Sequence, residues 1–306
     1  MSNDITQAAA YIKSATLAPL QVGLYSRAKV LEEVGDRGKF LGEPGQDGAA
    51  AVGGTLVSVL ANLTGLNRTD VANSLEFASR VAAKEVGADD HTEAYWNAFK
   101  TSIFQIGWFK QQDQWSSDFI DGTTTGAENF SDYVIENVRN DPLYSEAEKS
   151  VVIRAMESLR SQAEKRAFFR SFTAGGSKGS FGVNAASVTN GALAMRFSAF
   201  TFNCNAQVDD YLIFSIKNIK ADVRKDNVDA AANQRTIDAV RQQIEDKLDQ
   251  AAGDYIDGYD REALKFGYEW REPRHPVAAS AKLPEGPNLT IIMASGPLHA
   301  AYNGGT

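Results

Sequence analysis

The amino-acid sequence predicts an α+β fold, in which an antiparallel sheet forms a meander around residues 181–224 and several helices pack against it. Two observations predict this class. Residues 191–224 are the most strand-like part of the chain, and segments with helical periodicity precede and follow them. Because no linker separates these segments, we expect a single intertwined α/β globular domain over residues 1–270. A proline-rich extended tail is expected over residues 271–306.

The first ninety residues are predicted to be helical in several pieces. Mixed apolar and charged positions indicate helices over residues 3–14 and 20–34, and the glycine-rich run 35–54 has the composition of a loop. Residues 55–63 are apolar, and a helix is expected over residues 67–85 with Asn67 as its N-cap. The last two segments together suggest a buried helix hairpin.

Helical spacing continues in the middle of the chain. Residues 91–106 and 129–138 predict helices, and residues 108–115 are expected to be extended. Residues 145–170 predict a longer helix, which begins with a capping-box pattern between Ser145 and Glu148.

Three consecutive antiparallel strands are expected next. Residues 181–188 form the first, and Asn190-Gly191 is a strong signal for a two-residue turn. In the second strand the apolar pattern changes sides near Ala199, which implies either a bulge or a strand covered on both faces. Residues 211–216 are nearly all apolar and are therefore predicted to be a central strand that returns beside the second.

The segment after the predicted sheet changes from polar to amphipathic. Residues 225–233 are expected to form a polar loop. Apolar residues at helical spacing from Ile237 to Tyr255 then predict a long helix that lies on the sheet.

Composition limits the partners. The chain has 306 residues and 43% apolar content, so it can bury a large core. A net charge of −8 and a pI near 5.1, with no cluster of Lys or Arg, oppose binding to nucleic acid and to anionic membrane surfaces. We therefore expect no nucleic-acid partner.

The single cysteine excludes an intrachain disulfide. No signal peptide is expected, because MSNDITQAAAYIK lacks a basic segment followed by a long apolar run. No stretch approaches the 18 apolar residues that suggest a membrane span. Synthesis in the cytoplasm is expected, with export by a leaderless route or membrane association as later fates.

Motifs for catalysis are weak. Residues 175–179 match the G-x-S-x-G string of a hydrolase nucleophile elbow, but a helix is expected before the string and a strand after it, the reverse of the required order. A flexible loop is the better interpretation. The three histidines, His91, His275 and His299, are too scattered for a metal site. Since no acid, base and nucleophile come together in the sequence, we predict that the chain is not an enzyme and binds no metal.

Cys204 has three possible roles. It can be a small buried hydrophobe, the usual role of a lone cysteine. As a catalytic thiolate it would need a basic neighbour, which the sequence around it does not offer. An acylated cysteine needs an apolar slot instead. Five apolar residues are predicted to line such a slot: Phe200, Phe202, Leu212, Phe214 and Ile216.

The hairpin containing TFNCNA and the segment EAYWNAFKTSIFQIGW at residues 93–108 carry a resemblance to a known family. Together they resemble the Erwinia virulence factor (Evf) family, bacterial insect-gut persistence factors with an α/β fold and one central cysteine that carries a thioester-linked palmitate. The resemblance covers about residues 69–255 and rests on element order, the aromatic segment and the lone cysteine. It implies that Cys204 is the acylated residue, and it assigns a role to no other residue of this sequence.

The resemblance implies a non-enzymatic virulence or toxin-like host-interaction protein with covalently bound palmitate. Its partners would be the fatty acid and a host membrane or membrane vesicles. A lipid-binding or structural protein with an unmodified cysteine is the alternative, and a hydrolase is the third. An elongated apolar cavity beside Cys204 is expected to hold the chain, since one acyl chain without a polybasic patch attaches weakly to membranes.

Overall fold

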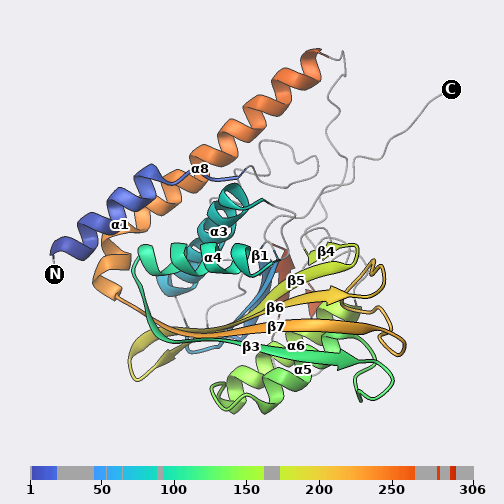
Figure 1. The fold of residues 1–306 in the computed structure, drawn as a ribbon. Helices are drawn as coiled ribbons and strands as arrows, with labels where there is room; N and C mark the ends of the chain where they lie inside the picture. Colours follow the sequence, from blue (N-terminus) through green and yellow to red (C-terminus); the bar gives the residue numbers. More distant parts are fainter. Residues whose placement is uncertain are drawn as a thin grey trace.

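The computed structural model describes residues 2–18, 45–52, 54–63, 65–87, 92–161, 173–265, 281–282 and 290–293 (Figure 1). Its helices are α1 (Ser2–Ser14), α3 (Leu66–Glu85), α4 (Glu93–Gln105), α5 (Phe130–Asn140), α6 (Glu146–Ser161) and α8 (Gln234–Lys265). Its strands are β1 (Gly48–Val52), β2 (Thr55–Val59), β3 (Trp108–Asp121), β4 (Ala174–Gly175), β5 (Lys178–Thr189), β6 (Ala192–Cys204), β7 (Lys220–Ala232), β8 (Ala281–Lys282) and β9 (Thr290–Met293). The predicted α+β class is confirmed.

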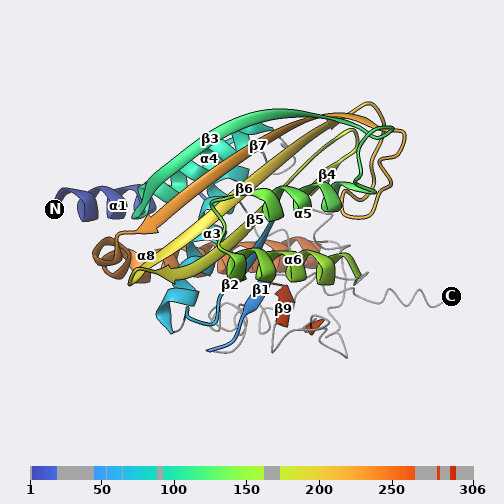
Figure 2. The ribbon, with the colours of Figure 1, turned by 90° about the horizontal axis from the view of Figure 1, so that it is seen from below.

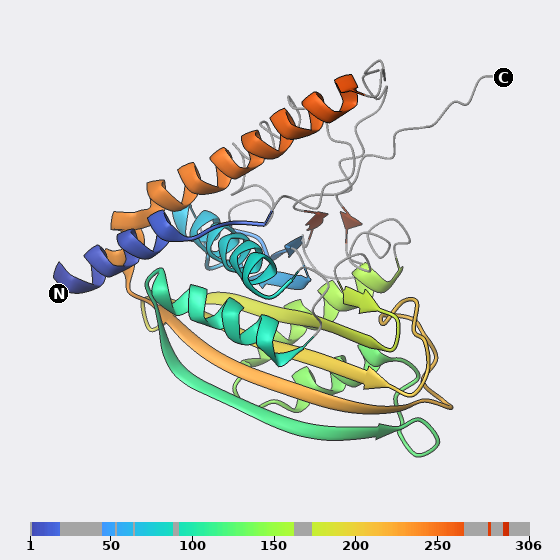
Figure 3. The same cartoon turned by 45° about the horizontal axis from the view of Figure 1, so that its top comes forward.

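These strands form one curved, mostly antiparallel sheet in the order β3-β7-β6-β5-β2-β1-β9-β8, and β4 pairs with β5. Two pairings, β2 with β5 and β1 with β9, are parallel. Helices α5 and α6 cover one face of the sheet, and α3 and α4 cover the other (Figure 2). Helix α8 crosses outside α3 beside α1 (Figure 3).

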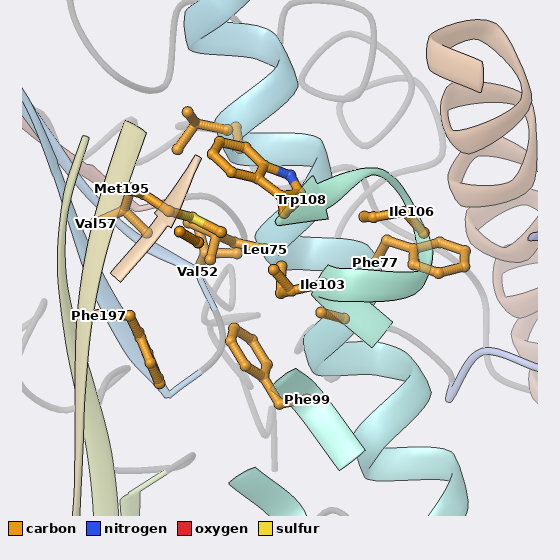
Figure 4. Close-up of a cluster of buried hydrophobic side chains, with 14 of the residues drawn as sticks. Val52, Val57, Leu75, Phe77, Phe99, Ile103, Ile106, Trp108, Met195 and Phe197 are labelled. Atoms are coloured by element: carbon orange, nitrogen blue, oxygen red, sulfur yellow. The ribbon is translucent and has the colours of Figure 1, made fainter. Parts of the chain in front are cut away.

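The sheet therefore separates two hydrophobic cores. The α5/α6 cluster holds the aromatic residues near Cys204, among them Phe130, Phe181, Phe200, Phe202 and Tyr211. Figure 4 shows the α3/α4 cluster, in which Met195 and Phe197 of β6 face the helices. Its helical side includes Leu75, Phe99, Ile103 and Ile237.

Strand β6 contributes side chains to both cores. Its register with β5 is continuous, from Lys178 opposite Asn203 to Thr189 opposite Ala192, so the strand has no bulge there. The change of apolar side near Ala199 therefore reflects a strand covered on both faces, one of the two predicted explanations. At the turn, Asn190 has φ 53° and Gly191 has φ 78°, and positive φ at both central residues is what a type I′ hairpin requires.

The prediction that residues 211–216 form a central strand is wrong. They belong to the loop 205–219, and the strand beside β6 is β7, with Cys204 opposite Ala221. The loop residues are apolar because they fold back onto helix α5. There Ser131 Oγ donates to the carbonyl oxygen of Leu212 at 2.7 Å, and the N–H of Ile216 donates to the carbonyl oxygen of Glu128 at 3.0 Å. An apolar run reports burial, and burial does not distinguish a packed loop from a strand.

Three other expectations fail for related reasons. The polar loop predicted at residues 225–233 lies mostly within β7, whose Val223 and Val228 face opposite cores. The helix hairpin is wrong, because its first arm is strand β2, and β1 occupies the end of the predicted glycine-rich loop. The N-cap of α3 is Gly65 rather than Asn67.

Several local predictions are confirmed. Helices α1, α4 and α5 occupy the expected segments, and β3 extends the predicted strand at residues 108–115. The capping box at α6 is present: Glu148 Oε2 accepts from the N–H of Ser145 at 2.8 Å, and Ser145 Oγ accepts from the N–H of Glu148 at 3.3 Å. The predicted helix over residues 20–34 and the end of the helix over 145–170 lie outside the described residues.

Helix α8 does not lie on the sheet as expected. Its main contacts are with α1 and α3, and Arg241 binds Asp70 of α3 through two hydrogen bonds of 2.7 and 2.8 Å. Within the predicted tail, β9 pairs with β1 and β8 pairs with β9. The rest of that segment lies outside the described residues, and the division into domain and tail stays a prediction.

Candidate functional site

Cys204 is the last residue of β6 and is 8% exposed. Its N–H donates to the carbonyl oxygen of Ser177 at 2.7 Å, which joins it to the turn between β4 and β5. Residues 175–179, the G-x-S-x-G string, lie in a β-hairpin, because Gly175 of β4 pairs with Lys178 of β5. No helix follows the serine, so the geometry of a nucleophile elbow is not formed.

The thiol has one polar neighbour. Cys204 Sγ lies 3.7 Å from Tyr211 Oη, and the hydroxyl of Tyr211 donates to the carbonyl oxygen of Gly176 at 3.3 Å. The tyrosine proton is directed at Gly176, which leaves the thiol to donate to Oη. Loop 205–219, strand β6 and the β4–β5 turn thus meet at this sulfur atom.

The electrostatics of this site keep the thiol neutral. Burial raises the pKa of Cys204, and the hydrogen bond with Tyr211 offsets this only in part. Burial, together with Cys204, also raises the pKa of Tyr211. A nucleophilic cysteine needs a lowered pKa, so the site does not activate Cys204 as a thiolate.

Aromatic rings pack against the site. The ring centroid of Phe202 lies 4.7 Å from that of Phe130, 5.5 Å from Tyr211 and 5.6 Å from Phe181. Phe130 and Tyr211 are 5.0 Å apart. These separations are typical of aromatic side chains in contact.

The structure brings the five predicted lining residues into one cluster. Phe200, Phe202, Leu212 and Ile216 are buried in the α5/α6 cluster, and Phe214 packs against it while partly exposed. Sequence reasoning misses Tyr211 as the partner of the thiol, because the apolar run at residues 211–216 predicts a strand. It also missed Phe130 and Phe181, which no local pattern connects to Cys204.

The surroundings of Cys204 are apolar enough for an acyl chain, but they leave no open space for one. The cluster is apolar, as hydrocarbon requires, yet its rings are already in contact. An acyl chain would therefore have to displace Tyr211 or pass beneath loop 205–219. Two hollows lie elsewhere: a cavity of about 10 Å³ next to Phe99 and Phe197, and a groove of about 530 Å³ between α1 and α8.

A second cluster of functional groups lies on the opposite face of the sheet. Lys100 Nζ of α4 lies 2.5 Å from Asp226 Oδ2 and 2.6 Å from Asp113 Oδ1, and 5.3 Å from the ring centroid of Trp115. Asp226 is fully buried, and burial raises its pKa to about 6 although Lys100 acts to lower it. Burial acts to raise the pKa of Asp113, but the hydrogen bonds and charges of Lys100 and Lys110 outweigh burial, so this pKa is lowered.

Sequence reasoning missed this ion cluster because Asp226 stood in a predicted loop. The alternation of Val228 and Ala230 with polar residues was the available signal that the segment is a strand. Among the described residues, no three His, Cys, Asp or Glu side chains are grouped so that they could hold a metal ion. Among the described helices, none is both long and apolar enough to cross a bilayer.

Neither a family model nor a curated protein matches this chain. Among solved structures, a delta-endotoxin aligns with a TM-score of 0.34 and 13% identity, over 60% of this chain and 82% of its own. The Evf virulence factor aligns with a TM-score of 0.35 and 12% identity, over 82% and 90% of the two chains. At TM-scores below 0.5 and identities of 12–13%, these alignments establish neither a shared family nor a shared activity, and the resemblance to the Evf family stays a prediction.

Proposed function

We propose that this chain is a non-enzymatic, toxin-like host-interaction protein that carries a fatty acid, palmitate, on Cys204 through a thioester. The observation that supports this most is the setting of the thiol: it is neutral, buried and joined to an aromatic cluster at the start of loop 205–219. Such a thiol suits neither nucleophilic catalysis nor metal binding. The two roles left are a packed thiol and an acylated one; the latter needs a fatty acyl thioester as donor, whose acyl group moves to Cys204 Sγ while the donor thiol leaves with the Cys204 proton.

In this proposal, loop 205–219 moves to make room for the acyl chain. The loop carries Tyr211 and Leu212, and their displacement would open the α5/α6 cluster next to the sulfur atom. A palmitoyl chain supplies hydrocarbon worth on the order of 10 kcal/mol gross when buried, at about 0.8 kcal/mol per methylene.

We propose that the protein acts at a membrane and that, before it meets one, its acyl chain is buried in the protein core. A single acyl chain attaches only marginally to a bilayer unless a second signal helps it. With a net charge of −8 and no second cysteine, this chain offers no such signal. We therefore propose that the acyl chain is buried until a membrane or vesicle receives it.

The second candidate is a structural or lipid-binding protein with an unmodified Cys204. The observation that favours it is the close ring packing around Phe202, which fills the space beside the sulfur atom. In that case Cys204 acts as a small apolar residue.

The deciding experiment is intact-mass spectrometry of the protein purified from its own host, before and after neutral hydroxylamine. Acylation predicts a mass increment of one fatty acyl group, lost on treatment and absent from the Cys204→Ser variant made in parallel. An unmodified mass for the wild-type protein would reject the proposal and leave the packed cysteine. An increment that persists in Cys204→Ser would place the modification elsewhere.

A further inference from the structure

Strand β3 is an open edge of the sheet. It stands at the end of the strand order, and within the described part of the chain β7 is its single partner strand. In Figure 2 it follows the outer rim of the sheet over its whole length. An edge strand presents unpaired N–H and C=O groups that can pair with another strand.

This edge is long and lightly protected. The register with β7 shifts once, between Lys110 and Gln112, and is then regular from Gln112 to Asp121. Most side chains of that regular run are exposed. It contains no proline and no lysine, two residues that often protect an edge from pairing, and its charged residues are Asp113, Asp118 and Asp121.

The α4 face of the regular run carries an aromatic pair. Trp115 and Phe119 lie opposite Asp226 and Asp222 of β7, so they share the face on which Asp226 contacts Lys100 of α4. Phe119 is 55% exposed, although it is a large apolar side chain. Ser117 lies between the two aromatic residues on the same face.

A second copy of the same strand complements this pattern. An antiparallel pair related by a two-fold axis at Ser117 would place Trp115 opposite Phe119 of the second copy, and Phe119 opposite its Trp115. That axis pairs residues 113–121 and thus uses nearly the whole regular run. An axis at Ser116 would instead pair Phe119 with Asp113 and leave both aromatic side chains without aromatic partners.

The charges at the ends of this pairing are also compatible. Asp113 would lie opposite Asp121 of the second copy, but each brings a lysine of its own chain. Lys110 lies 3.3 Å from Asp113, and Lys220 lies 3.8 Å from Asp121. Both lysines are more than half exposed, so each can also reach the acid of the other copy. The four side chains would form an alternating, neutral array.

We propose that β3 is a self-association surface, at which two copies of this chain pair antiparallel about Ser117 and join their sheets into one. The aromatic pairs of Trp115 with Phe119 occur twice in this dimer and cover the exposed Phe119 rings. The interface involves neither Cys204 nor loop 205–219, so it is independent of acylation.

The first test compares two exposed phenylalanines of β3 by sedimentation velocity of the full chain over a range of concentrations. Phe119→Ala is expected to weaken dimerisation roughly tenfold or more, because two aromatic pairs are lost. Phe109→Ala is the matched control: Phe109 is 54% exposed but lies before the register shift, outside the paired run. Wild-type protein that stays monomeric throughout, or equal weakening by both variants, would overturn the proposal.

The second test fixes the register with cysteines. In Ser117→Cys the new thiols of two copies face each other across the axis at Cα separations suited to a disulfide, so oxidised glutathione should give a covalent dimer. In Gln114→Cys the two thiols would be about 20 Å apart along the strands, and no dimer should form. Wild-type protein treated in the same way shows whether Cys204 alone gives a covalent dimer. Crosslinking of both variants, or of Gln114→Cys alone, would reject the pairing about Ser117, and so would failure of both to crosslink.

Discussion

Buried carboxylates on the two faces of the sheet are paired differently. On the α5/α6 face, Glu148 accepts from Ser145 and from Ser187 Oγ, and Asp141 accepts from Asn227 Nδ2. On the α3/α4 face, Asp226 contacts Lys100, but its Oδ1 accepts no hydrogen bond from the described residues. The amide of Asn184 also lacks a hydrogen-bond partner in the described ranges.

This difference indicates where the protein depends on single contacts. A fully bonded network distributes the loss of one member, whereas a buried charge with one partner depends on that partner alone. The Asp226 cluster on the α3/α4 face should therefore respond more strongly to a single polar substitution than the networks of Glu148 and Asp141 on the α5/α6 face, and four predictions follow from this contrast.

The largest effect is expected from Lys100→Met. Loss of the ammonium group leaves Asp226 buried without its cation, which should lower the free energy of unfolding at pH 7 by about 3–5 kcal/mol. Lys110→Met is the control, because Lys110 also contacts Asp113 but is mostly exposed, and such surface pairs contribute about 0–1 kcal/mol. Urea titrations measure both, and equal effects would contradict the contrast.

The next effect concerns pH. Since burial raises the pKa of Asp226 to about 6, the folded protein binds this proton more tightly than the unfolded chain does. The contribution of Asp226 to stability should therefore rise as the pH falls through 6 towards 4, by roughly 2–3 kcal/mol. Asp226→Asn should remove this contribution from a series of unfolding measurements between pH 7.5 and 4.5. A variant that keeps the wild-type pH dependence would show that Asp226 does not titrate in this range.

A smaller effect is expected at Cys204 on the other face. In protein without an acyl chain, Cys204→Ser should lower stability by about 1 kcal/mol, because the serine hydroxyl can still hydrogen-bond to Tyr211. If the wild-type protein is acylated, the same substitution should lower stability by much more, because it also removes an acyl chain that is buried in the core. Thermal unfolding of both forms measures the difference, and identical losses would argue against a structural acyl chain.

The smallest effect is expected from Tyr144→Phe in the bonded network. Tyr144 Oη lies 3.1 Å from Ser198 Oγ, which also donates to Asn227 Oδ1 at 2.8 Å. Ser198 keeps that acceptor in the variant, so the loss should be about 0.5 kcal/mol by urea titration, the low end for one hydrogen bond. A loss as large as that of Lys100→Met would show that this network depends on single contacts as well.

The sequence by itself determined the features that rest on local interactions. Helical periodicity placed α4 and α5, the pair Ser145 and Glu148 marked the start of α6, and Asn190-Gly191 marked the hairpin turn. Each depends on residues a few positions apart, whose contacts the helix or turn itself creates. Together they were sufficient for the α+β class.

Tertiary structure alone decided the features that join distant residues. Whether residues 211–216 became a strand or a packed loop depended on β7 taking the place beside β6, because the loop also buries Tyr211, Leu212 and Ile216. The contacts of Cys204 with Tyr211, and of Lys100 with Asp226, join segments that only the folded sheet and its helices bring together. A local pattern reports that a residue is buried, but the partner of that residue is set by how the whole chain packs.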